Sequence, residues 1–116
     1  MTSFQRPTVL QRSLVRRHSI GYLDDQPLEI VRADTGLVVV DTLVICNVAG
    51  STQTWTIWHV PAGEDVDDSQ SLFHEQTIAS KRSTVIEIPI ALAPGERLFA
   101  EASAATSLVL TAYERV

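Results

Sequence analysis

The chain has 116 residues, which predicts a single domain, and a formal net charge of −5 at pH 7. Hydrophobic residues make up 45% of it and charged residues 20%, the ordinary balance of a globular protein. The longest apolar run, residues 37–40, is far shorter than the ~20 residues of a membrane-spanning helix. The first residues also lack the apolar stretch of a secretory signal. We therefore expect no contact with a membrane.

Cys46 is the only cysteine, so no disulfide can form within the chain. Small domains made for oxidising compartments often carry several bridges. We therefore expect assembly in a reducing cytoplasm.

The charge is divided unevenly along the chain. Residues 1–18 hold four arginines and no acid, whereas the remainder holds five basic and all fourteen acidic residues, a net charge of −9. This split predicts a basic N-terminal arm, residues 1–27, attached to an acidic body, residues 28–116. The acidic body argues against a nucleic-acid-binding face. The arm either orders on a neighbouring protein or contributes a first strand, near residues 13–23, that pairs with the body.

From residue 28 on, short β-rich runs alternate with turn residues. They lie at residues 28–32, 37–48, 53–60, 77–80, 84–92, 97–102 and 106–113. The acidic stretch 64–76 interrupts them, and Asp67 or Asp68 is expected to cap one or two helical turns carrying Leu72 and Phe73 onto the sheet. About seven or eight short strands predict an all-β fold, a small antiparallel β-sandwich of jelly-roll or immunoglobulin-like type.

Turn chemistry predicts two hairpins. The runs at 37–48 and 53–60 are joined by the small residues 49–51, and the last two runs are joined by residues 103–105. Residues 84–92 alternate most regularly. Because the Pro89 nitrogen cannot donate to a ladder, that strand should lie at an edge or break there.

Two strands carry apolar residues on both faces. Trp55 and Ile57 share one face of their strand and Trp58 lies on the other, while Val109 and Tyr113 lie opposite the leucines of the last strand. Part of the outer surface therefore either meets another subunit or is covered by the acidic loop and the basic arm. Because the two tryptophans lie on opposite faces, they cannot form one sugar-stacking platform.

No catalytic or metal-binding pattern emerges. Cys46 lies in an apolar strand, where an inert core thiol is expected. His18, His59 and His74 lack metal-ligand spacing, and His59 is expected to be packed or hydrogen-bonded. The acids at 64–68 lack the glycine and the distal glutamate of a calcium loop. We expect a non-enzymatic protein with no cofactor, no metal and no small-molecule substrate.

Four short motifs lie at or near the ends of the expected strands. They are the strand Val44-Ile45-Cys46-Asn47, the V-P-x-G segment at residues 60–63, the turn at residues 78–83 and the L-x-P-G-E-x-L segment at residues 92–98. Together they resemble a loose group of small β-sandwich structural proteins from tailed bacteriophages, over about 80 residues of the chain. These motifs are turn and core residues, so the resemblance concerns fold and setting and transfers no catalytic residue.

The resemblance implies a virion component, assembled in a bacterial cytoplasm. We expect a capsid decoration or cement protein that packs on the major capsid protein or other virion proteins as a trimer or another homo-oligomer. The alternatives are a neck, tail or baseplate subunit that attaches fibres and, third, a carbohydrate-binding module for host attachment. The residues expected to contact partners, in the arm and on the apolar outer face, are Arg6, Arg12, Arg16, Arg17, Trp55, Trp58 and Tyr113.

Overall fold

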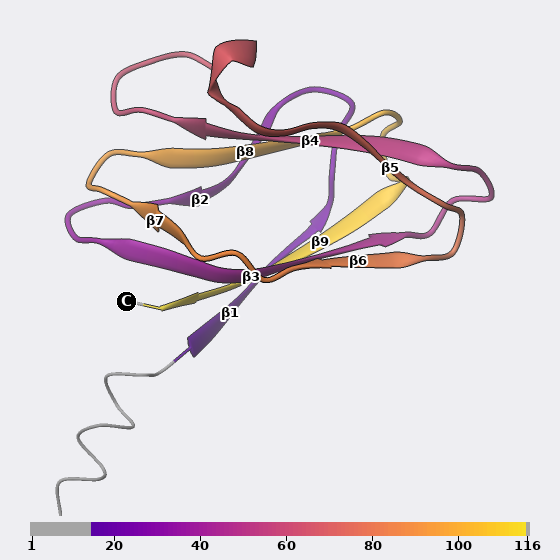
Figure 1. The fold of residues 1–116 in the computed structure, drawn as a ribbon, viewed down its shortest axis with the longest axis horizontal. Helices are drawn as coiled ribbons and strands as arrows, with labels where there is room; N and C mark the ends of the chain where they lie inside the picture. Colours follow the sequence, from indigo (N-terminus) through magenta and orange to yellow (C-terminus); the bar gives the residue numbers. More distant parts are fainter. Residues whose placement is uncertain (1–14, 116) are drawn as a thin grey trace, which may run out of the picture.

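The computed structural model describes the backbone of residues 15–115 and the side chains of residues 20–115. These residues form two antiparallel sheets that pack face to face (Figure 1). The β1 sheet has the order β1-β9-β3-β6, with β7 also pairing with β3, and the β2 sheet has the order β2-β8-β4-β5. The strands are β1 (Val15–Tyr22), β2 (Leu28–Arg32), β3 (Val38–Asn47), β4 (Gln53–Val60), β5 (Ser71–Ile78), β6 (Ser83–Ile86), β7 (Ile90–Leu92), β8 (Arg97–Ala102) and β9 (Leu108–Arg115).

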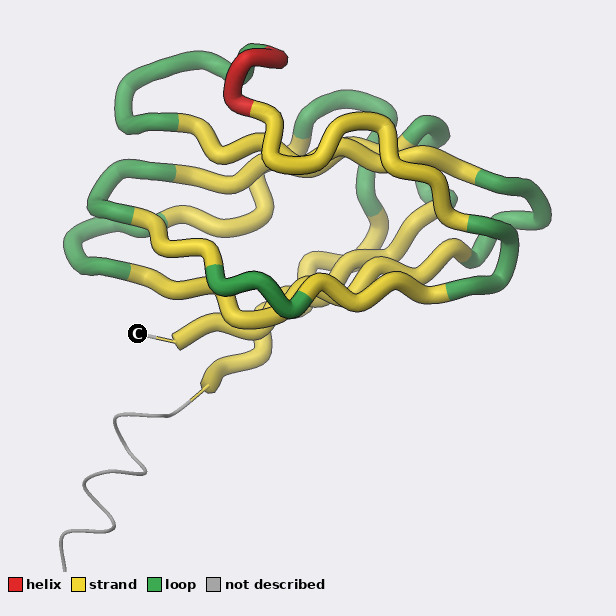
Figure 2. Tube along the Cα trace, viewed as in Figure 1, coloured by secondary structure: helices red, strands yellow, loops and turns green. Residues whose placement is uncertain are grey.

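This architecture confirms the predicted all-β sandwich. Successive strands mostly alternate between the two sheets, which is the arrangement of a jelly roll. Figure 2 shows how strands dominate the described residues, with one short 3₁₀ turn, η1 (Asp68–Gln70), outside the β2 sheet. The part of the chain that the structure describes holds no helix that is both long and apolar enough to cross a membrane.

The two predicted hairpins are wrong. β3 and β4 belong to different sheets, and so do β8 and β9, so the short turns between them are corners that cross the sandwich. Asn47 holds the first corner: its fully buried amide donates to the carbonyls of Ser51 and Ile78, at 3.0 Å each, and accepts from the Ala49 N–H. These bonds satisfy a buried polar group and fix the chain in the corner.

Two predictions about strand ends are confirmed. The run at 84–92 breaks into β6 and β7 around Pro89, on one edge of the β1 sheet. Asp67 caps η1, accepting from the Ser69 N–H at 2.9 Å. The turn is shorter than expected, because Leu72 and Phe73 already belong to β5.

The sandwich begins before the predicted boundary between residues 27 and 28. β1 pairs with β9 along its length, so the structure has the alternative first strand near residues 13–23 in place of an arm that runs to residue 27. Its main-chain groups complete the ladder of the long central strand β9. The arm positions before residue 15 lie outside the described residues.

The core lies between the sheets and consists mainly of aliphatic side chains. Leu43, Ile45, Leu110 and Ala112 are at most 1% exposed and come from the paired strands β3 and β9. Trp55 joins them from β4, with its ring 5.6 Å from that of Phe73. Since side chains alternate along a strand, the intervening residues of these strands point away from the core.

Candidate interaction face

The outer side of the β1 sheet is built from side chains that alternate with the core residues. Register places Val44 beside Thr111 and Cys46 beside Val109, while β6 and β1 extend the same face on either side. Its members are uncharged and partly or largely exposed, with Tyr22 at 57% and Val85 at 55%. We call this surface the open face: Tyr22, Val44, Cys46, Val85, Val109, Thr111 and Tyr113.

One ion pair stands at the end of the open face. Arg115 of β9 contacts both carboxylate oxygens of Asp41, at 2.8 and 3.0 Å, where a bulge interrupts the pairing of β3 with β9. Among the side chains described on β3, β6 and β9, these are the charged groups that flank the face. Because they neutralise one another, they bring almost no net charge to it.

The outer side of the β2 sheet differs, because the acidic loop of this chain, residues 61–70, lies over it (Figure 1). Trp58 and Val60 of β4 point away from the core cluster, yet they are only 4% and 0% exposed. η1, at the end of that loop, contacts β4. We call this side the covered face.

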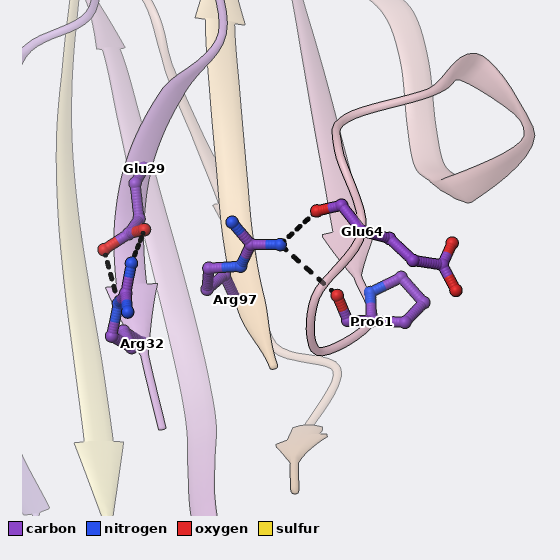
Figure 3. A network of polar contacts seen from close by, with 5 residues as sticks. All are labelled: Glu29, Arg32, Pro61, Glu64 and Arg97. Atoms are coloured by element: carbon purple, nitrogen blue, oxygen red, sulfur yellow. Dashed lines mark hydrogen bonds and ion pairs between the residues drawn. The ribbon is translucent and has the colours of Figure 1, made fainter. Parts of the chain in front are cut away.

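Arg97 anchors the acidic loop to the sheet. Its guanidinium donates to the backbone carbonyls of Pro61 and Glu64 (Figure 3). It also lies 5.4 Å from the centre of the Phe99 ring. Gly95 allows the neighbouring turn to approach the loop, since a Cβ there would lie 2.8 Å from the Ala62 Cβ. Arg97 therefore holds the loop against the sheet, through hydrogen bonds to the loop and a cation–π contact with a ring of β8.

The rim of the covered face is charged. Arg32 donates to both carboxylate oxygens of Glu29, at 2.8 and 3.1 Å, and these bonds hold the pKa of that carboxyl below its ordinary value (Figure 3). A hollow of about 400 Å³ separates Arg32 from Arg97 and is also lined by the acidic Glu64 and Asp65. Since the guanidinium groups already have partners within the chain, the hollow offers no ready anion site.

Burial and neighbouring acids both act on Glu101, on β8 of the same face. Burial is the larger cause that raises its pKa above the ordinary value, followed by the charges of Asp25, Asp68 and Glu75. A group in this state costs the folded protein stability when it is ionised. The covered face therefore carries excess negative charge.

The histidine and cysteine side chains weighed as candidates for catalysis or metal binding make ordinary contacts within the fold. His59 Nε2 lies 3.0 Å from Glu96 Oε1, so the expectation of a hydrogen-bonded histidine is confirmed. The Ala93 N–H and then His59 hold the pKa of Glu96 below its ordinary value. Cys46 is half-buried on the open face, so its expected place in the core is wrong. Within residues 20–115, no three His, Cys, Asp or Glu side chains gather in a way that could hold a metal ion.

The predicted partner-binding residues are scattered. Arg6 and Arg12 lie outside the described residues, and the β1 backbone places Arg16 opposite Glu114 and Arg17 opposite Tyr113. The three predicted aromatic residues have separate positions: Trp55 lies in the core, Trp58 lies on the covered face and Tyr113 lies on the open face. Neither indole is exposed, so the two tryptophans offer no surface for stacking a sugar.

Sequence reasoning missed most of the open face. Tyr22 fell within the segment assigned to the arm, and Val44 and Cys46 were read as parts of one continuous apolar strand. Val85 carried a usable signal, because it shares the alternating parity of Glu87 and Ala91 and so faces away from Ile86.

The fold has a distant neighbour among solved structures. No protein family matches the sequence, and no curated protein matches it. The fold is similar to that of the Eiger TNF from S. frugiperda, with 13% sequence identity and a TM-score of 0.46. That alignment covers 88% of this chain and 85% of the other.

Proposed function

We propose that this chain is a structural subunit of a bacteriophage particle, without catalytic activity, that packs on the capsid as a decoration or cement protein. The open face carries this proposal, as a surface for contact with a neighbouring subunit of the particle. Tyrosine and valine side chains on an exposed sheet face are the composition of a protein-contact surface. The strand-end motifs, which resemble small phage structural proteins, support the setting.

The fold supports a role based on packing. A domain of about this size buries only ~60–70% of the surface its unfolded chain exposes, so its own core is modest. Docking through an additional apolar face adds stability that grows with the logarithm of partner concentration. The lone half-buried thiol of Cys46 fits assembly in a reducing bacterial cytoplasm.

Location on the particle tests the proposal. Tailed particles from the cells that carry this sequence are purified, probed with an antibody against the chain and imaged by electron cryomicroscopy. We expect regularly spaced density over the head, in hundreds of copies. A small ring of copies at the neck or tail would favour the neck, tail or baseplate alternative instead, and absence from purified particles would refute a virion role altogether.

A further inference from the structure

We propose that the open face binds the same face of a second copy of this chain, so that the protein self-associates through the outer side of the β1 sheet. This inference rests on the proposed function only in taking the chain to act by packing. It names the surface and the partner.

The sheet edges are unsuited to pairing with another copy. β1 and β2 each contain a register shift, next to Gly21 and Val31. β5 pairs irregularly with β4 and holds Glu75 at a φ of 47°, and the fourth edge is interrupted around Pro89. Bulges and prolines at edges block the addition of a strand from another molecule. Of the two ways in which sheets associate, packing by a face is the one left open.

The distribution of charge favours the open face over the covered face for contact with a second copy. A second copy brings the same acidic body, and on the covered face it would meet Glu101 together with Asp25, Asp68 and Glu75. Burying like charges against one another is strongly unfavourable. The open face has no such cluster among its described side chains, and its flanking Asp41–Arg115 pair is already neutralised. Two identical acidic chains can therefore approach each other best through this side.

Composition also favours a copy of the chain over a differently charged partner. The described side chains of the face present rings, methyl groups, three hydroxyls and one thiol, so none of them needs an opposite charge from its partner. A basic partner would gain more on the acidic covered face. Side chains without charge do not repel the same side chains of a second copy, which favours contact between identical patches.

The open face is large enough for an interface between two copies. The strands β1, β9, β3 and β6 have 8, 8, 10 and 4 residues. At ~3.3 Å per residue and ~4.8 Å between strands, they give roughly 480 Å² of flat footprint. Side-chain relief increases the accessible area toward the ~800 Å² that each partner contributes to a standard interface. The open face can thus support a specific contact between two copies.

Two exposed aliphatic residues provide a matched test. Val85 lies on edge strand β6 within the open face and is 55% exposed, whereas Leu72 lies on edge strand β5 of the other sheet and is 42% exposed. Val85→Glu places a charge in the proposed contact, and Leu72→Glu places the same charge outside it. Both sites are exposed, so the variants should fold; circular dichroism and thermal melting confirm that they do.

The full chain and both variants are compared by analytical ultracentrifugation over a range of concentrations. We expect the unaltered chain and Leu72→Glu to self-associate equally, and Val85→Glu to bind its copies at least about tenfold more weakly. A chain that stays monomeric at all concentrations overturns the inference. Equal association of all three proteins, or equal loss in both variants, also overturns it.

The natural thiol of Cys46 provides a second measurement of contact between copies, because it lies in the open face itself. Its reaction with a thiol reagent should slow as protein concentration rises, and this dependence should disappear in Val85→Glu; unchanged dependence would count against the face. The results also separate the two proposals. A monomeric chain that decorates particles refutes self-association alone, whereas a self-associating chain missing from particles refutes the virion role alone.

Discussion

Outside the β2 sheet, on the side where the acidic loop lies, Trp58 and Val60 are almost fully buried, whereas outside the β1 sheet Val44, Val109 and Tyr113 are only half-buried. Both sheets carry apolar side chains on their outer sides, so alternation along the strands does not distinguish them. The difference lies in the connections. The long segment between β4 and β5 runs over one face, while no described connection crosses the other.

This difference shows that an apolar outer face can have two origins in a small sandwich. On the covered face, the chain completes a second small core by its own means, with Arg97 holding the loop in place. On the open face, no connection between the described strands provides such a cover. The covered face should therefore contribute to the stability of the monomer, and the open face to association.

The largest effect should come from Trp58→Ala. Removing a buried indole beneath the acidic loop costs about 3–5 kcal/mol of unfolding free energy. Urea unfolding of dilute protein measures this loss. Tyr113→Ala, on the open face, is the matched control and should cost far less under the same conditions. Similar losses for both residues would mean that the two faces do not differ in the monomer.

Next in size is Arg97→Met, which keeps the length of the side chain and removes its donors. Two carbonyl acceptors, of Pro61 and Glu64, lose a charged donor, so we expect a loss of about 1–3 kcal/mol. Limited proteolysis should cut the acidic loop faster in the variant. Arg32→Met removes a guanidinium that bonds to Glu29 and not to the loop, so cleavage there should stay at the rate of the unaltered chain. Equal protection in all three proteins would show that Arg97 does not hold the loop.

The sequence predicted the layers of this fold better than its connections. The β-rich runs, the break at Pro89 and the cap at Asp67 follow from local chemistry, and the structure contains them. The corner after β3 does not follow, because small residues suit both a tight hairpin and a crossing between sheets. What decides between them is distant in sequence: Asn47 bonds to the carbonyl of Ile78, 31 residues away.

Prediction of the interaction face from the sequence was limited in the same way. Alternation correctly placed the two tryptophans on opposite faces of their strand, but the expectation that Trp55 also lies on the outer face is wrong, because it belongs to the core. Alternation also contains no information about the path of a loop. That path depends on contacts across more than 30 residues, between Arg97 and the carbonyls of Pro61 and Glu64. Tyr22 was missed for a related reason, since β1 is recognisable only by its pairing with β9.

A smaller effect is expected from Val109→Thr, in the middle of the open face. Threonine keeps the shape and strand preference of valine, so the monomer should lose less than ~1 kcal/mol. Association should weaken more clearly, because the new hydroxyl is buried only when copies meet. Thermal melting at several concentrations checks this: the concentration dependence of the Tm should shrink while the melting of dilute protein hardly changes. A large loss in dilute protein would show that Val109 already belongs to a core.

The smallest effect concerns charge on the covered face. Burial and three neighbouring acids raise the pKa of Glu101 above its ordinary value of 4.5, so the folded state binds its proton more tightly than the unfolded chain does. The ionised carboxylate therefore destabilises the fold at neutral pH. Glu101→Gln should raise the unfolding free energy there by a few tenths of a kcal/mol, since the group is partly solvated.

The pH dependence separates this electrostatic origin from a packing effect. As the pH falls through the raised pKa, the carboxylate of the unaltered protein becomes protonated and its cost disappears. The advantage of Glu101→Gln should thus vanish below about pH 4, and added salt should reduce it at neutral pH. Urea unfolding at both pH values measures it. An advantage that persists unchanged in acid would mean that glutamine merely packs better, and the acidity of the covered face would then no longer explain why a second copy prefers the open one.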